Sequence, residues 1–319
     1  MKKIFLIISL LCSLFVNSQT VDFYPKSSSA PTGFMIINRA GKAGVIIYLH
    51  GVGGRGCGSM DPWCLPALLP PELHLQVFGV KGGRNEVPKE FIDNAVANDF
   101  VIVAPQTATD WTINDVNNVL GHAALAGFDK KRIYGVGFSL GAKGIADFIL
   151  SSQVNAEKFA AVVIVATIQI PTNANYGNIV AAKLPVLLVH CADDRNSGTP
   201  PSASANFLAA INDLAPTPPA DLIMLNSGDH SGALSQIIVN APPANPFTSS
   251  AAWFNNPGCS IYQWFKQNTS DQPKRFSRIG EGCDLVPAPP VPPAKTEESR
   301  FVWRGKTFIF YTDGTWEQK

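Results

Sequence analysis

The sequence predicts an α/β fold in which a mostly parallel central sheet is flanked by helices. Short apolar runs rich in β-branched residues alternate along the chain with longer segments of helical character. Several of these runs are apolar on both faces, as strands buried inside a parallel sheet are. Regular alternation of strands and helices is typical of one sheet covered by helices.

The elements expected from this pattern lie in a main domain at residues 19–284. The strands are expected at 34–38, 44–50, 100–104, 132–137, 160–166, 185–190 and 222–226. The helices are expected near 89–97, 114–126, 140–150, 202–213 and 252–266.

The composition limits the class of protein. The chain has 319 residues, of which 46% are hydrophobic, so it can bury a sizeable core and is not globally disordered. Lys and Arg number 25 against 24 Asp and Glu, which argues against a dedicated nucleic-acid binder, because such proteins normally have a basic surplus. Charged residues make up only 15%, so neutral polar groups must cover much of the surface.

Residues 1–18 have the layout of a signal peptide. Lys2 and Lys3 precede an apolar run that ends at Val16, and this run is shorter than the ~20 residues of a membrane span. Val16 and Ser18 suit the positions before a cleavage site, so we expect a mature chain that begins at Gln19 and is secreted or periplasmic. A membrane anchor or a buried first strand is the alternative. No later apolar run is long enough to cross a bilayer, so no membrane span is expected after signal removal.

Export would permit disulfide bonds. Cys57 with Cys64, and Cys259 with Cys283, flank Gly- or Pro-rich loops and are expected to form two local bridges. Cys191 would then remain free and buried at a strand end. Five cysteines follow the signal peptide, which is an odd number, and their connectivity is not deducible from the sequence.

The C-terminal end has a different character. Residues 285–298 are dominated by proline and are expected to form a stiff extended linker. Residues 299–319 alternate aromatic and polar side chains, and Asp313-Gly314 is a turn signal, so a β-hairpin is expected there. About twenty residues cannot form a stable domain alone, so docking on the main domain is the favoured interpretation. An aromatic contact surface for sugar chains or a partner is the alternative.

The strongest functional signal is the sequence Gly137-Phe138-Ser139-Leu140-Gly141. It follows an apolar strand and precedes a helical segment, which is the context of a nucleophile elbow. In such an elbow a tight turn lifts the serine hydroxyl out of the sheet, and glycines are needed where backbones crowd. Ser139 is therefore the candidate nucleophile. A glycine-rich turn in an ordinary strand–helix unit is the alternative.

A serine hydroxyl needs a base beside it, and the expected order in this context is serine, acid, histidine. Of the five histidines in the chain, only His190 and His230 follow Ser139. His190 ends an apolar strand and precedes the acid candidates, so it does not fit the order. His230 lies in a small-residue segment that reads as a loop after the last expected strand. Elimination singles out His230 as the general base, against the alternative of a solvated loop histidine.

The acid is expected just after the strand at 185–190. Asp193 and Asp194 both lie there, and one of them can accept the imidazole N–H while the other caps a turn. Counting from the strand end favours Asp194. Asp229 is adjacent to His230, and neighbours in sequence rarely place their side chains for such a bond.

A tetrahedral intermediate requires N–H donors. One donor is expected from Leu140, directly after the candidate nucleophile. The other is expected from the glycine-rich loop HGVGGRG at 50–56. Gly51, Gly53 and Gly56 also fit the spacing of a GxGxxG phosphate loop, but no acidic residue follows a second strand ~20 residues further on, as a dinucleotide site requires.

Taken in order, these segments resemble the α/β-hydrolase superfamily. The set is LHGVGGRG at 49–56, VIVAPQ at 101–106, RIYGVGFSLGAKG at 132–144, VLLVHCADD at 186–194, GDH at 228–230 and IYQWF at 261–265. Within the superfamily it is similar to secreted esterases of the predicted-peptidase type, related to feruloyl and acetylxylan esterases and to polyhydroxybutyrate depolymerases. The resemblance implies an α/β-hydrolase fold with Ser139 as nucleophile, Asp194 as acid and His230 as base. It also implies Val52 and Leu140 as oxyanion-hole donors.

We therefore expect a secreted serine carboxylesterase that forms an acyl-enzyme and needs neither a metal nor an organic cofactor. The expected substrates are small or polymeric esters of carbohydrate or polyester type, with polysaccharide as a candidate partner. Trp111 and the segment 57–85 follow strand ends, where α/β sites lie, and are candidate pocket walls. Ordinary core is the alternative for Trp111. A serine peptidase of the same fold and a non-catalytic carbohydrate-binding protein are the alternative functions.

Overall fold

The computed structural model describes residues 21–24, 32–52, 87–168, 170, 174–196, 198–237, 247–249, 260–271, 297–303, 306–311 and 316–318. The chain divides into two compact units, one of Thr20–Leu285 and one of Met1–Gln19 with Val286–Lys319. The expected signal peptide, the cysteines of both expected disulfides, the segment 57–85 and most of the expected linker lie outside the described residues.

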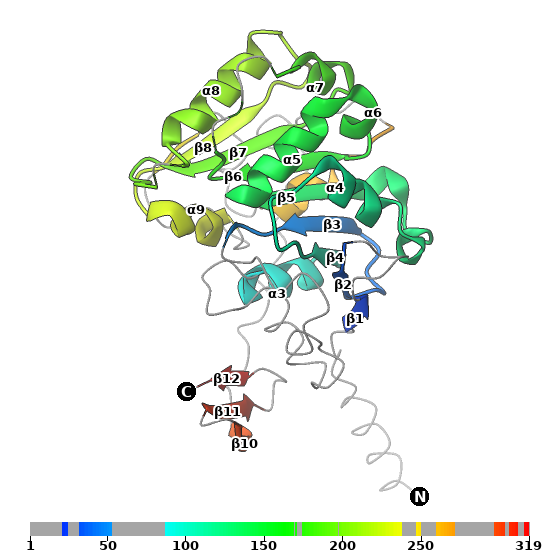
Figure 1. The fold of residues 1–319 in the computed structure, drawn as a ribbon, viewed down its shortest axis with the longest axis vertical. Coiled ribbons are helices and arrows are strands. Elements are labelled where there is room, and N and C mark those ends of the chain that lie inside the picture. The colour runs from blue at the N-terminus through cyan, green and yellow to red at the C-terminus, as the bar shows by residue number, and fades with distance from the viewer. Residues whose placement is uncertain are drawn as a thin grey trace, which may run out of the picture. The chain divides into compact units, whose positions relative to one another are not determined.

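The larger unit contains a nine-stranded sheet with the order β1-β2-β4-β3-β5-β6-β7-β8-β9 (Figure 1). Its strands are β1 (Val21–Tyr24), β2 (Phe34–Ile37), β3 (Gly44–Leu49), β4 (Phe100–Pro105), β5 (Ile133–Phe138), β6 (Ala161–Val165), β7 (Val186–Cys191), β8 (Asp221–Leu225) and β9 (Phe247–Ser249). The run from β4 to β8 pairs in parallel, whereas β1, β2 and β9 join the sheet antiparallel. The predicted mostly parallel sheet is confirmed.

Helices cover both faces of this sheet. One face carries α3 (Lys89–Ala97), α9 (Asp229–Ile237) and α10 (Ile261–Lys266). The other carries α4 (Ile113–Leu120), α5 (Leu140–Ser151), α6 (Gln153–Ala156), α7 (Gly177–Ala181) and α8 (Pro201–Asn212).

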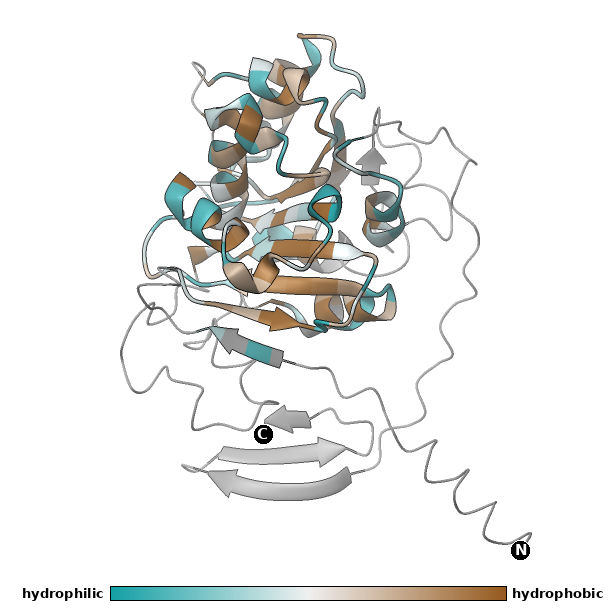
Figure 2. Ribbon diagram, turned by 90° about the vertical axis from the view of Figure 1, so that its right-hand side faces the viewer, coloured by the Kyte–Doolittle hydropathy of each residue, from teal (hydrophilic) through white to brown (hydrophobic). Residues whose placement is uncertain are grey.

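Strand β3 shows why its residues are apolar without interruption. Ile46 and Tyr48 belong to the core under one helical layer, while Val45, Ile47 and Leu49 belong to the core under the other. Successive side chains of a strand point to opposite faces, so a strand covered on both sides must be apolar at every position. Figure 2 shows this as hydrophobic colour along the central strands.

Most expected elements agree with the structure to within a residue or two, but two expected helices differ. Of the helix expected at 252–266, residues 252–259 lie outside the described residues, Ser260 is a non-helical N-cap, and only Ile261–Lys266 is helical. The expected helix at 114–126 is wrong in length. Helix α4 ends at Leu120, Gly121 follows, and a separate short turn η4 (Ala123–Leu125) begins after His122. The Nδ1 atom of His122 accepts the N–H of Ala124 at 3.1 Å and so starts this turn. The strand β5 also extends one residue beyond the expected 132–137, to Phe138. Strands β1 and β9 and helices α6, α7 and α9 were not expected.

The smaller unit contains a three-stranded antiparallel sheet of β10 (Glu297–Trp303), β11 (Lys306–Tyr311) and β12 (Trp316–Gln318). Phe301 is paired with Phe308, and Phe310 with Trp316. Strands β11 and β12 lie on either side of the expected turn signal, Asp313-Gly314, in the sequence. Strand β10 is a third strand beside the expected hairpin. In the part of the chain that the structure describes, no helix has the length and apolar character needed to cross a membrane.

Candidate active site

Ser139 occupies the tight turn between β5 and α5. Its backbone φ of 54° and ψ of −114° lie in a region that residues with a Cβ rarely adopt. Its N–H donates to the carbonyl oxygen of Val165 at 2.9 Å, which ties the turn to the end of β6. A strained serine held between a strand and a helix has the geometry of a nucleophile elbow.

The first glycine of the GxSxG sequence is required by this turn. A Cβ atom on Gly137 would lie 2.3 Å from the carbonyl oxygen of Gly141. Real Cβ atoms essentially never approach another atom that closely, so a larger residue at position 137 would force the elbow open. The spacing seen in the sequence therefore follows from backbone crowding.

His230 lies in the first turn of α9, so the loop expected for it is wrong. The side chain of Asp193 caps the start of this helix: its Oδ1 accepts the N–H of Asp229 at 3.0 Å and its Oδ2 accepts the N–H of Gly228 at 3.3 Å. Gly228 has a φ of 139°, which suits glycine alone. The small residues that suggested a loop instead form the start of a helix. The N–H groups there, which have no acceptor within the helix, donate to the Asp193 carboxylate in the turn after β7.

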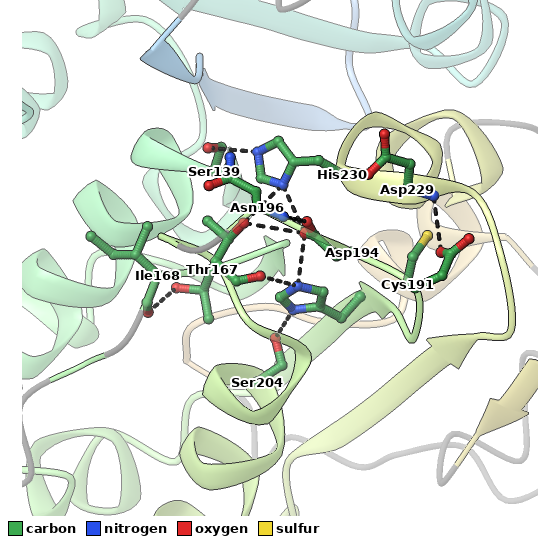
Figure 3. Close-up of polar contacts among 12 residues, drawn as sticks. Ser139, Thr167, Ile168, Cys191, Asp194, Asn196, Ser204, Asp229 and His230 are labelled. Carbon is green, nitrogen blue, oxygen red and sulfur yellow. Dashed lines mark hydrogen bonds and ion pairs between the residues drawn. The ribbon is translucent and has the colours of Figure 1, made fainter.

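The structure brings Ser139, His230 and Asp194 together in one line of contacts (Figure 3). The Nε2 atom of His230 lies 2.9 Å from the Oγ of Ser139, and the Nδ1 atom lies 2.8 Å from the Oδ2 of Asp194. A carboxylate only accepts, so Nδ1 carries the hydrogen and Nε2 is left to accept the serine hydroxyl proton. The ring of Phe138 packs beside the imidazole with centroids 5.0 Å apart.

The side chain of Asp194 is fully buried. Burial alone would raise the pKa of this carboxyl, but hydrogen bonds from His230 and from the N–H of Asn196 outweigh it, and the pKa is lowered. The Oδ1 atom accepts the Asn196 N–H at 2.9 Å, and the Oδ2 atom accepts the hydroxyl of Thr199 at 3.2 Å. Asp194 is therefore held as a carboxylate, in fixed orientation. Asp193 contacts the start of α9 instead, so the two neighbouring aspartates have different partners.

Of the two expected oxyanion-hole donors, Leu140 directly follows this serine, and Val52 follows a glycine that packs against it. Leu140 is the first residue of α5, and the first N–H groups of a helix have no acceptor within the helix. A Cβ on Gly51 would lie 3.2 Å from the Cβ of Ser139, so the loop after β3 passes directly against the elbow. Val52 follows at once and is 53% exposed.

Trp111 lies in the core, which favours the alternative that the sequence left open for it. Its side chain belongs to the cluster under α4 and α5, and only 5% of the residue is exposed. Its indole N–H donates to the carbonyl oxygen of His50 at 3.0 Å. The Nε2 atom of His50 in turn accepts the N–H of Thr107 at 3.3 Å. Trp111 thus supports the start of the loop that carries Val52, and offers a substrate little surface.

Sequence reasoning missed His190 as part of this cluster. Its Nε2 atom lies 3.1 Å from the same Oδ2 of Asp194 that His230 contacts, and its Nδ1 atom lies 2.8 Å from the Oγ of Ser204. The only available signal was a histidine inside an apolar strand, where an imidazole needs polar partners. The neighbouring Cys191 is free and buried, as expected. Its pKa is raised to about 12, mainly by burial and to a smaller extent by the charges of nearby aspartates.

The strand order, with Ser139 after β5, Asp194 after β7 and His230 after β8, is that of the α/β-hydrolase fold. No family model matches the sequence, and no curated protein matches it.

Among solved structures, similar ones include an acylaminoacyl peptidase from Pyrococcus horikoshii, with 15% identity and a TM-score of 0.44 over 70% of this chain. Est1E from Butyrivibrio proteoclasticus matches with 13% identity and a TM-score of 0.43, over 66% of this chain and 90% of that one. MGS-M1, an α/β-hydrolase enzyme from a Medee basin deep-sea metagenome library, matches with 12% identity and a TM-score of 0.43, over 66% of this chain and 83% of that one. The chain spans only 39% of the length of the acylaminoacyl peptidase.

Proposed function

We propose that this protein is a serine hydrolase that cleaves carboxylic esters through an acyl-enzyme. The observation that carries the proposal is the line of contacts from the Ser139 hydroxyl through both nitrogens of His230 to the buried carboxylate of Asp194. A serine hydroxyl is a weak nucleophile, and an imidazole oriented by a carboxylate is the arrangement that activates it.

In the acylation half of the reaction, the Oγ of Ser139 attacks the ester carbonyl carbon while its proton passes to Nε2 of His230. Asp194 accepts the Nδ1–H and stabilises the imidazolium that forms. The N–H groups of Val52 and Leu140 stabilise the negative oxygen of the tetrahedral intermediate. The imidazolium then gives its proton to the departing alcohol oxygen, the carbon–oxygen bond breaks, and the acyl group remains on Ser139.

In the second half, water replaces the alcohol. His230 takes a proton from the water as it attacks the acyl carbon, and the second tetrahedral intermediate uses the same two N–H donors. Its collapse returns the proton to Ser139 and releases the carboxylic acid. All of these steps use groups of this chain and water.

The test is the reactivity of Ser139. Wild-type protein is treated with a fluorophosphonate probe and assayed on p-nitrophenyl acetate and butyrate, beside Ser139→Ala and Ser151→Ala. Ser151 is the last residue of α5, the helix that Ser139 precedes, and its hydroxyl donates to the carbonyl oxygen of Phe148 at 2.6 Å, which makes it a matched control. We expect wild type and Ser151→Ala to be labelled and active and Ser139→Ala to be neither. An unlabelled wild-type protein, or an active Ser139→Ala protein, would overturn the proposal.

For the substrate class, we propose esters of carbohydrate or polyester type. Only 15% of the residues in the chain are charged, and a sparsely charged surface suits uncharged polymers better than charged ones. A panel of acetyl, feruloyl, polyester and peptide-anilide substrates distinguishes this from a serine peptidase, which would cleave the anilide. Glycan binding without any probe labelling would favour a non-catalytic carbohydrate-binding protein.

We also propose that the enzyme acts outside the cytoplasm, because Lys2, Lys3 and the apolar run that follows have the layout of an export signal. Sequencing the N-terminus of protein recovered from the medium or periplasm of an expressing cell tests this. A chain that begins at Gln19 is expected, and an uncleaved chain in the cytosol would contradict it.

A further inference from the structure

We propose that His190 is a positioning residue for the triad, and that its Nε2–H holds the Asp194 carboxylate in the orientation that His230 requires. This inference rests on the proposed function, because it assigns a second histidine to the same site. His190 is buried on β7 and does not reach Ser139 through any described contact, so its effect must pass through Asp194.

The geometry converges on one oxygen atom. The Oδ2 of Asp194 lies 2.8 Å from Nδ1 of His230 and 3.1 Å from Nε2 of His190. The Thr199 hydroxyl is 3.2 Å from the same Oδ2 and 3.0 Å from the Nδ1 of His230. The oxygen that accepts from the general base is therefore fixed by two further donors, neither of which lies on α9.

The partners of His190 determine which of its nitrogens carries the hydrogen. Nε2 faces two acceptors, Oδ2 of Asp194 at 3.1 Å and the carbonyl oxygen of Thr199 at 3.0 Å. A bare Nε2 lone pair would be repelled by both, so the hydrogen lies on Nε2. Nδ1 then accepts from the Ser204 hydroxyl at 2.8 Å. Every polar atom of this buried ring has a partner in this tautomer alone.

His190 stays neutral in this setting. Burial lowers its pKa, despite the opposing effects of the Thr199 carbonyl and the Asp194 charge. A neutral donor orients the carboxylate but leaves its negative charge uncompensated, so that charge remains available to the imidazolium that forms on His230 during the reaction. A cation at position 190 would weaken that attraction.

Two substitutions separate positioning from simple core packing. His190→Gln places an amide N–H near the position of Nε2, where it reaches Asp194. His190→Asn places its amide near the position of Nδ1, where it reaches Ser204 but not Asp194. The two variants are similarly polar and similarly buried, so each serves as the control for the other. Both are compared with wild type in fluorophosphonate labelling of Ser139, in kcat and KM, in the pH profile of kcat/KM, and in thermal unfolding.

We expect His190→Gln to keep kcat within about threefold of wild type. His190→Asn should lower kcat about tenfold, because it loses a hydrogen bond to a charged group and only part of that bond's free energy bears on the rate. KM should change little, because a buried ring does not touch the substrate. With one donor missing the carboxylate holds a proton more readily, so the acid limb of the His190→Asn profile should move to higher pH. Equal kcat and equal pH profiles in the two folded variants would overturn the proposal.

A measurement on the wild-type protein covers the case in which His190→Asn does not fold. Nitrogen and proton NMR of histidine-labelled protein reports which ring nitrogen of His190 is protonated at neutral pH. A hydrogen on Nε2 supports the proposal, and a hydrogen on Nδ1 alone overturns it, because no donor would then face Asp194. Failure of wild type to label with the probe is a different result: it removes the proposed function and this inference with it.

Discussion

A Cβ atom on Gly141 would lie 1.9 Å from the carbonyl oxygen of Leu49. The first turn of α5 therefore rests directly on the end of β3, with no room for a side chain between them. This contact fixes the elbow against the loop that begins at His50. The packing of Gly141 on Leu49 therefore positions both the serine and the loop that carries the expected donor Val52.

The first prediction is that Gly141→Ala destabilises the protein by about 3 kcal/mol or more, because the added methyl group collides with backbone that cannot yield. Urea unfolding measures it. Gly127→Ala is the matched control, since a Cβ on Gly127 would meet nothing within 4 Å. The control should change stability by less than about 1 kcal/mol. Equal stability of the two variants would contradict the tight contact at Leu49.

The second prediction separates the neighbouring aspartates. Asp194→Asn removes the carboxylate that accepts from His230 and should lower kcat by up to about 10⁴-fold. Asp193→Ala removes the cap from Gly228 and Asp229, and should cost about 1 kcal/mol of stability with a much smaller loss of kcat. Steady-state kinetics and urea unfolding of both variants measure these effects. The assignment fails if Asp193→Ala is the more damaging change for catalysis.

The third prediction concerns Trp111. Trp111→Phe removes the N–H that donates to the His50 carbonyl and leaves a small gap in the core. Stability should fall by about 1–3 kcal/mol, and kcat should fall severalfold while KM stays nearly constant, because the loop that carries Val52 loses its support. A rise in KM with unchanged kcat would instead identify Trp111 as a wall of the substrate pocket.

The fourth prediction is a pH dependence of stability that arises from His190. Its pKa in the folded protein is lowered below the ordinary value of 6.5, chiefly by burial. Below that ordinary value the unfolded chain binds a proton that the native chain does not, so stability should fall as the pH decreases from about 7 to about 5. Asp194 acts only at more acid pH: its contribution is lost progressively as the pH falls below the ordinary value of 3.8 and through the lower folded-state pKa.

Urea unfolding at several pH values measures this slope, and His190→Gln provides the comparison. The variant has no group at position 190 that titrates in this range, so its slope should be shallower than that of wild type. Identical slopes would show that His190 does not titrate differently in the folded and unfolded chains.

Much of the fold was predictable because burial leaves a direct mark on the sequence. The strands that pair in parallel, such as β3 and β6, are apolar on both faces, and no polar position interrupts them. Strand β1 left no such mark, because it is short and edge-placed and carries Asp22. Gly228 lies just before α9, which begins at Asp229, and a composition of small residues does not distinguish a capped helix start from a loop.

The three aligned residues of the candidate site were the ones that the sequence favoured, although chain order left Asp193 open beside Asp194. Ser139 was marked by its glycines, and the position of His230 followed from elimination. Thr199 and Ser204 left no pattern, and His190 left only its place inside an apolar strand. Their role depends on which atoms the end of β7 and the start of α8 bring within hydrogen-bond distance. Linear spacing does not encode such three-dimensional convergence.

Asp193 and Asp194 hold the same histidine in two ways, one through the backbone that leads into α9 and the other through the imidazole ring. A displacement of the turn after β7 therefore carries the helix and the acceptor in the same direction. Small thermal displacements of this turn would therefore move His230 and Asp194 together, and the distance between their side chains would be preserved. Substitutions in other loops around the site would then change which molecules enter it without changing the geometry of proton transfer between Ser139 and His230.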